Sequence, residues 1–136
     1  KRILTSNRDL FQYARQQGKM LFTHAGVRDG WFRNDFHGDS SKNCSIADQL
    51  NNPTQEQFVA MGEVGFWRGG PYEYGGIFWA DIDETKDNPL KGYHQFVGHS
   101  RVDSIKSAKI DDETTITYCD CLYNDQYLVI NRQNMN

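Results

Sequence analysis

Apolar residues in this chain occur in short runs of strand length, separated by loops rich in glycine, aspartate and asparagine. The clearest runs cover residues 19–23, 76–80 and 93–97. Such runs, bounded by polar residues or glycine, are typical of short buried strands, and all are too short to span a bilayer. The pattern therefore predicts a fold centred on a sheet, with no membrane partner.

Helical signals are concentrated in the first half of the chain. A capped amphipathic pattern predicts a helix over residues 6–17, with Gly18 as its C-terminal cap. Residues 27–52 are rich in Asp, Asn, Ser and Gly, so they are expected to form a long irregular loop with one helical turn at 46–50. A second helix is predicted over residues 53–62.

Strand signals dominate the last part of the chain. Alternating residues predict strands at 108–110, 114–119 and 126–131, with Asn124 and Asp125 as a hairpin turn. Together with the early helices, they predict an α/β (α+β) fold: a mixed sheet with a C-terminal hairpin, flanked by helices. A chain of 136 residues allows one modest core, so residues 1–136 are expected to form a single domain.

Composition and charge exclude several function classes. The chain is 38% hydrophobic and 13% aromatic, which is typical of a globular protein. With Lys+Arg 15 against Asp+Glu 18 and no basic run, nucleic acid is not an expected partner. The cysteines Cys44, Cys119 and Cys121 are odd in number and lack framework spacing, which predicts a reducing, cytoplasmic compartment. Cys119 and Cys121 are interpreted as core residues rather than as a metal clip.

Two histidines share one local pattern. His24 and His99 each follow an apolar strand and each have a glycine nearby. In layered α/β proteins, the ends of buried strands are where side chains from distant parts of the chain converge. A metal ion shared by the two residues would therefore be held by a tertiary site, not by a local finger. The alternative is a pair of hydrogen-bonded structural histidines.

Several motifs in order resemble those of calcineurin-like metallophosphoesterases, the protein serine/threonine phosphatase type. Residues 21–27 resemble the strand and "HAG" loop of that family, and residues 96–100 resemble its "GHT" or "GHS" motif. Residues 77–80 resemble an apolar strand that ends in Trp, and residues 118–121 lie where the family has an "IDTG"-like strand. Each motif is short, but the ordered set spans residues 20–130 and is moderately specific.

The resemblance implies that His24 and His99 bind the second ion of a two-metal centre (Mn, Fe or Zn) that hydrolyses phosphoesters. The family's other ligands come from the motifs GDxHG, GDxxDRG and GNHE, which do not occur in this chain. We therefore expect it to be the C-terminal half of such a catalytic domain, half of a two-sheet β-sandwich. The expected partner is the N-terminal half or a second copy. Alone, the chain is expected to be a poor enzyme.

Phosphate binding is expected to need an arginine near the metal ligands. Relatives often carry one two positions after the strand tryptophan, where this chain has Asp81, and a carboxylate there is expected to repel phosphate. Arg28, Arg68 and Arg101 lie in loops near the motifs and are the candidate substitutes. The resemblance leaves the substrate open between a phosphorylated protein, a dinucleoside polyphosphate and a small phosphomonoester.

A rival hypothesis is a non-catalytic binding module that uses the aromatic loop 66–74 to recognise a partner or a sugar, because aromatic faces bind rings well. It does not require His24 and His99 to converge. The acidic stretches 81–84 and 111–113 lack the spacing of a calcium loop and are interpreted as solvated turns.

Overall fold

The computed structural model describes residues 6, 10–41 and 44–131. It has an α+β fold built on one mixed five-stranded sheet, in the order β1-β2-β3-β5-β4. Its strands are β1 (Ala14–Gln17), β2 (Met20–Thr23), β3 (His94–Arg101), β4 (Lys106–Lys109) and β5 (Thr115–Asp120). The central pairs β2/β3 and β3/β5 are parallel, while the outer pairs β1/β2 and β4/β5 are antiparallel hairpins.

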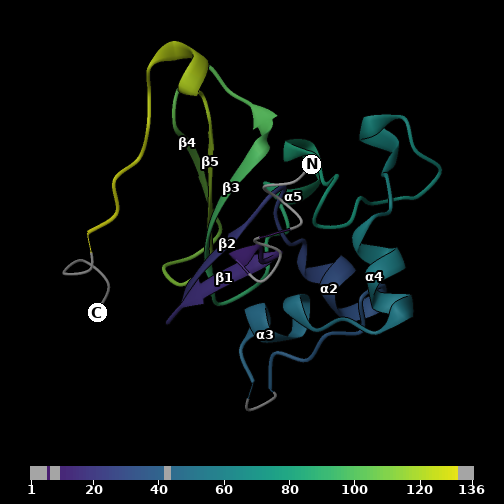
Figure 1. Ribbon diagram of the computed structural model, residues 1–136. Helices are drawn as coiled ribbons and strands as arrows, with labels where there is room; N and C mark the ends of the chain where they lie inside the picture. The colour runs from purple at the N-terminus through teal and green to yellow at the C-terminus, as the bar shows by residue number, and fades with distance from the viewer. Residues whose placement is uncertain (1–5, 7–9, 42–43, 132–136) are drawn as a thin grey trace.

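Short helices occupy the crossover between the parallel strands β2 and β3. They are α2 (Asp29–Asn34), α3 (Ile46–Asn51), α4 (Gln55–Met61), the 3-10 turn η2 (Phe66–Arg68) and α5 (Ile82–Thr85). A second 3-10 turn, η3 (Leu122–Asn124), follows β5. Figure 1 shows the helices gathered on one side of the sheet and the segment after β5 on the other. Within the described residues, no helix combines the length and hydrophobicity needed to cross a membrane.

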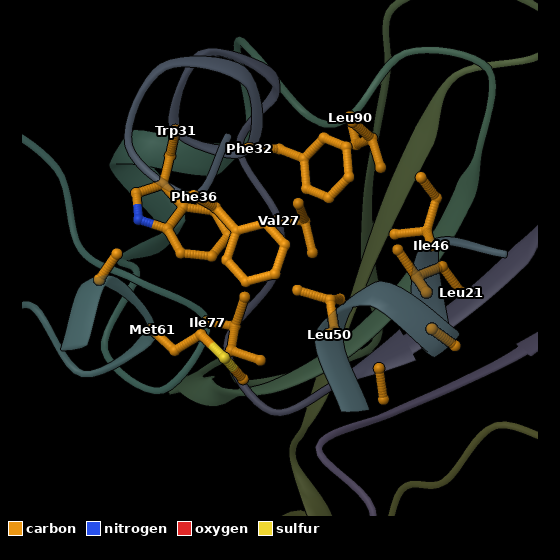
Figure 2. Packing of buried hydrophobic residues seen from close by; sticks show 13 residues of the cluster. Leu21, Val27, Trp31, Phe32, Phe36, Ile46, Leu50, Met61, Ile77 and Leu90 are labelled. Atoms are coloured by element: carbon orange, nitrogen blue, oxygen red, sulfur yellow. The ribbon is translucent and has the colours of Figure 1, made fainter. Parts of the chain in front are cut away.

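The main core lies between β2 and the helices α2, α3 and α4. Leu21 from the sheet meets aromatic side chains of the α2 region and aliphatic side chains of α3 and α4 (Figure 2). The largest fully buried members of this cluster are Trp31, Phe32, Phe36, Leu21, Ile46, Leu50, Met61, Ile77 and Leu90. The apolar residues of segment 27–52, which were expected in an irregular loop, thus form much of the core.

The predicted helix over residues 6–17 is wrong at its C-terminal end, because Ala14–Gln17 forms β1. Residues 7–9 of that prediction lie outside the described residues. The amide of Asn51 in α3 bonds both the backbone N–H and the C=O of Ala14, at 3.0 and 2.7 Å. Gly18, with φ +57°, forms the β1/β2 turn instead of a helix cap. Tertiary pairing has therefore overridden the local helical pattern.

Other expected elements differ in detail. Segment 27–52 contains α2 as well as the expected turn near α3. The second helix begins later than predicted, because Thr54 caps it in a capping box with Gln57. Residues 76–80 form a turn, and residues 126–131 follow η3 without forming a strand, so both predicted strands are wrong. The C-terminal hairpin is β4/β5, not a turn at Asn124 and Asp125.

A buried amide fixes the loop that leaves β2. Gln95 is fully buried; its side-chain oxygen accepts from the Val27 N–H and its nitrogen donates to the Val27 C=O, both at 2.8 Å. Because Val27 belongs to the loop that starts with His24, this pair connects the loop to β3. Gln95 thus helps to position the candidate site.

Replacing Gln95 with Leu is expected to lower the free energy of unfolding by about 1–3 kcal/mol, because the Val27 N–H would be buried without a partner. Urea denaturation followed by circular dichroism measures the change. Gln55→Leu, at an exposed position on α4, is the matched control. Equal effects of the two substitutions would contradict this role for Gln95.

Candidate metal centre

His24 directly follows β2 and is exposed. The next residues turn into the core: the Ala25 N–H bonds the Ile77 C=O at 3.0 Å, and Gly26 has φ +108°. A Cβ on Gly26 would lie 3.2 Å from Ile116 and 3.3 Å from Thr85, so this position combines a left-handed backbone with close packing. Glycine at position 26 therefore allows the backbone after His24 to turn into the core, while the His24 imidazole stays at the surface.

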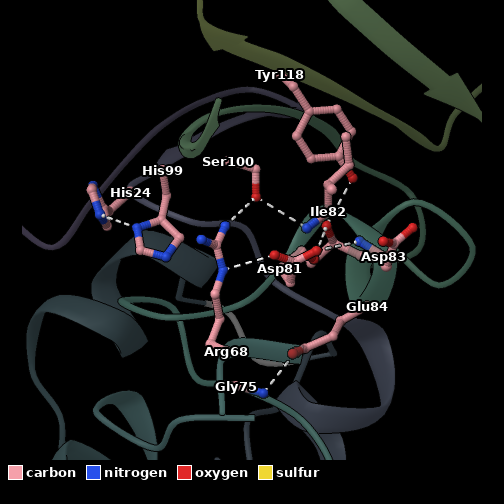
Figure 3. A network of polar contacts seen from close by, with 11 residues as sticks. His24, Arg68, Gly75, Asp81, Ile82, Asp83, Glu84, His99, Ser100 and Tyr118 are labelled. Carbon is pink, nitrogen blue, oxygen red and sulfur yellow. Dashed lines mark hydrogen bonds and ion pairs between the residues drawn. The ribbon is translucent and has the colours of Figure 1, made fainter. Parts of the chain in front are cut away.

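His99 lies at an irregularity in β3. The register with β5 shifts between Val97 and Arg101, and His99 has φ +58°. A bulge of this kind changes the direction in which side chains leave a strand and is frequent near functional sites. Here His99 and the next residue, Ser100, both lie beside the same Arg68 (Figure 3).

The structure brings the two predicted histidines together. Nε2 of His24 lies 2.9 Å from Nδ1 of His99, and the ring centroids are 4.8 Å apart at 66°. One ring must donate the proton and the other must accept it, so at least one nitrogen in this contact is unprotonated. Two imidazole nitrogens from distant segments thus face each other at the sheet edge.

The pair suits a shared metal ion. A tetrahedral zinc ion bound to two nitrogens at about 2.0–2.1 Å holds them about 3.3 Å apart, close to the observed separation. Nε2 of His99 is buried and has no hydrogen-bond partner among the described residues. A ligating imidazole normally donates its other N–H to a second group. Within the described part of the chain, no cluster of three or more His, Cys, Asp or Glu forms a metal site, so the chain offers a pair of ligands.

The environment of His99 keeps its imidazole neutral. Partial burial, the nearby Arg68 and the neighbouring His24 all lower the pKa of His99 below its ordinary value. The edge of the Trp79 ring also packs against His99, with the centroids 5.7 Å apart at 88°. A neutral imidazole has a lone pair for a metal ion at physiological pH.

The other two histidines lie outside this arrangement. His37 is exposed and has φ +54°. His94 opens β3 and its Nδ1 lies 3.0 Å from the Thr115 hydroxyl, which is a structural contact.

The three candidate arginines lie in different surroundings. The Arg28 guanidinium is 3.5 Å from the centre of the Tyr74 ring, and that of Arg101 is 5.2 Å from the Tyr123 ring. Arg68 is the one held next to His99 (Figure 3). The cavity beside Arg28 also contains the acidic residues Asp35, Glu63 and Glu73.

The acidic stretch 81–84 is not a solvated turn. Asp81 caps α5 by accepting from the Asp83 N–H at 2.9 Å, and it pairs with Arg68 at 2.7 Å. Glu84 is only 4% exposed and accepts from the Gly75 N–H at 2.7 Å. The Asp-x-x-Glu spacing is a helix-start signal that the sequence analysis missed. Stretch 111–113 is exposed, as predicted.

Glu84 predicts a pH effect on stability. Burial raises its pKa above the ordinary value, so the folded chain retains this proton to a higher pH than the unfolded chain. Stability from this group is therefore fully present below the unfolded value and is lost as pH rises through the folded pKa. Glu84→Gln is expected to reduce the loss of stability between about pH 4.5 and pH 7, as measured by urea denaturation. The exposed control Glu113→Gln should keep the wild-type slope.

Comparisons with known proteins leave the site to be argued from its own geometry. No family model, curated protein or solved structure matched this chain. The facing nitrogens of His24 and His99, with the side chains around them, therefore define the candidate site.

Proposed function

We propose that this chain supplies ligands to a metal centre that hydrolyses phosphoesters. The observation that carries the proposal is the 2.9 Å approach of His24 Nε2 and His99 Nδ1, two residues far apart in the sequence. Strand ends, a glycine turn and a bulge hold them at one edge of the sheet.

The proposed chemistry divides roles between ions and side chains. Two divalent ions (Mn, Fe or Zn), when bound, activate a water molecule and neutralise phosphoryl oxygens. His24 and His99 present neutral nitrogens to one of these ions, and Trp79 packs on the His99 ring and restricts its orientation. The substrate class is a phosphorylated protein or a small phosphoester, and the three free cysteines fit a cytoplasmic location.

The proposed partner is a second sheet from an N-terminal half of the same domain. Support comes from the sheet face opposite the helices, where Phe22 and Phe96 stack with ring centroids 5.2 Å apart. Together with residues from segment 122–130 they line an apolar cavity of about 490 Å³. The parallel register places Phe22 and Phe96 side by side on this face. A second sheet packing here would complete a β-sandwich.

A binding module remains the second candidate function, because part of the aromatic loop 66–74 is exposed. Phe66 and Trp67 are each 63% exposed and Tyr72 is 45% exposed. This hypothesis predicts that a partner or sugar binds the loop whether or not metal is present. It also predicts that replacing His24 or His99 leaves that binding unchanged.

The test of the phosphoesterase proposal is reconstitution. The chain is combined, in cis or in trans, with a segment that carries the GDxHG, GDxxDRG and GNHE motifs, and hydrolysis of p-nitrophenyl phosphate is measured with added Mn²⁺ or Zn²⁺. Activity is expected only in the combination, since His24 and His99 alone leave an ion weakly held. Activity that is insensitive to a metal chelator would contradict the proposal.

The apolar surface on this side of the sheet predicts self-association of the isolated chain. Phe22 and Phe96 are half-buried beside segment 122–130, which carries exposed apolar side chains, including Leu122 and Tyr127. Burial of a phenylalanine contributes about 1.5–3 kcal/mol, so Phe96→Lys is expected to weaken association by at least about tenfold. Sedimentation equilibrium measures this change. Phe66→Lys in the aromatic loop is the control, and a compact wild-type monomer at all concentrations would rule the prediction out.

A further inference from the structure

Arg68 is held beside the histidine pair at two points. It is the last residue of η2, which ends at Gly69 with φ +76°. Its Nε forms an ion pair with Asp81 Oδ2 at 2.7 Å, and its Nη2 donates to Ser100 Oγ at 2.9 Å. The side chain is 30% exposed, so the guanidinium is fixed on one side and open on another.

The two groups that hold Arg68 are themselves fixed. The second oxygen of Asp81, Oδ1, accepts from the Asp83 N–H at 2.9 Å. Ser100 Oγ also accepts from the Ile82 N–H at 3.1 Å. Both acceptors are therefore anchored by the first turn of α5, which is next to the bulge that carries His99. This geometry orients the guanidinium before any ligand binds.

The remaining N–H groups of Arg68 are available. Among the described residues, this guanidinium makes one hydrogen bond through Nη2 and one ion pair at Nε, whereas the group carries further donors in a planar fork. Figure 3 shows the fork between His99 and Asp81, with His24 on the far side of His99. Planar forks of this kind bind phosphoryl oxygens in pairs.

The ion pair also changes the role expected for Asp81. A free carboxylate beside the metal site would repel phosphate, but this carboxylate is paired at 2.7 Å and only 15% exposed. Arg28 and Arg101 lack such an arrangement, because each lies over a tyrosine ring instead. Asp81 thus acts on the arginine rather than on the substrate.

We infer that Arg68 binds the phosphoryl oxygens of the substrate and that Asp81 and Ser100 position it. The ligand class is the phosphoryl group of a phosphomonoester, or inorganic phosphate as the product. The inference rests on the proposed function, because it places this group against an ion held by His24 and His99. Arg68 would donate two hydrogen bonds from its open edge while keeping its ion pair with Asp81 and its hydrogen bond to Ser100.

The experiment measures two affinities separately on the full chain. Zinc affinity is measured by calorimetry, and inorganic phosphate affinity by phosphorus NMR titration with and without zinc. Arg68→Ala is expected to weaken phosphate binding at least about tenfold and to leave zinc affinity within about twofold. Arg68→Lys should remain several-fold weaker than wild type, because an ammonium cannot replace the fork.

Asp81→Asn separates positioning from net charge. If Asp81 contributed only its negative charge, Asp81→Asn would strengthen phosphate binding. Because Asp81 positions Arg68, we expect the variant to weaken phosphate binding by about threefold to tenfold. The control Arg101→Ala removes a cation that is held elsewhere and should leave both affinities unchanged. Tighter phosphate binding by Asp81→Asn would overturn the role of Asp81.

The two proposals fail in different ways. If wild type and Arg68→Ala bind phosphate with the same affinity, both with and without zinc, the inference about Arg68 is overturned. Absence of zinc binding in the wild-type chain contradicts the metal site instead. If phosphate binds without zinc and Arg68→Ala weakens that binding, the result supports Arg68 as the residue that binds phosphate.

Discussion

Replacing His99 with Ala is expected to lower the phosphatase activity of the reconstituted two-segment domain about a thousandfold. The second ion stabilises charge on the phosphoryl oxygens by several kcal/mol, and about 4 kcal/mol corresponds to a factor of a thousand in rate. His24→Ala should have an effect of similar size, because the two nitrogens share one ion in the proposed site. The measurement is kcat/KM for p-nitrophenyl phosphate at saturating Mn²⁺.

The chain contains a matched control for this substitution. His37 and His99 both have left-handed backbone angles, φ +54° and +58°, so alanine introduces the same local strain at each position. His37 is exposed and belongs to no motif, so His37→Ala should retain activity. Equal losses in the two variants would attribute the effect to backbone strain and remove His99 from the site.

The second large effect is expected on zinc binding by the chain alone. Two neutral imidazoles should bind zinc modestly, and His99→Ala should reduce the affinity by at least about a hundredfold, to the level of a single surface histidine. Zinc and nickel should bind better than manganese, which prefers oxygen ligands. Calorimetric titration of wild type, His99→Ala and His37→Ala compares the three directly.

The zinc affinity should also depend on pH. Protons compete with the metal for imidazole nitrogens, so the affinity should fall as pH drops through the ordinary imidazole range near ~6.5. Because burial, Arg68 and His24 lower the pKa of His99, protons compete for this imidazole at a lower pH than for an ordinary one. A zinc affinity that is constant from pH 7.5 to 5.5 would exclude these histidines as ligands.

The candidate site was partly predictable because its signals are local. His24 directly follows β2, His99 lies inside β3 at its bulge, and the two strands are adjacent and parallel, so the two residues meet at one end of the sheet. Strand, histidine and glycine are close together in the sequence in both motifs. The bulge that directs His99 was not predictable, because it exists only in the pairing of β3 with β5.

The incorrect elements have a common cause. Residues 14–17 fit a helical pattern, but Asn51 of α3 bonds Ala14 and β2 pairs along the whole segment. Gly18 was predicted as a helix cap, which is wrong; its left-handed φ serves the β1/β2 turn, a position that glycine suits as well as a helix cap. The preference of a residue for helix or strand is worth about a fraction of a kcal/mol, and pairing with distant segments easily overcomes it.

The sequence by itself determined the apolar runs that precede His24 and His99, because these depend on the residue types in a short window. The expected mixed sheet is confirmed, but the pairing that makes it mixed joins segments far apart in the chain. Only the tertiary structure decided that Asp81 pairs with Arg68 and that Glu84 is buried. These contacts depend on the path of the crossover between β2 and β3. The residues next to a charged residue in the sequence do not show whether its partner is water or a distant side chain. Its role is therefore fixed only when the chain has folded.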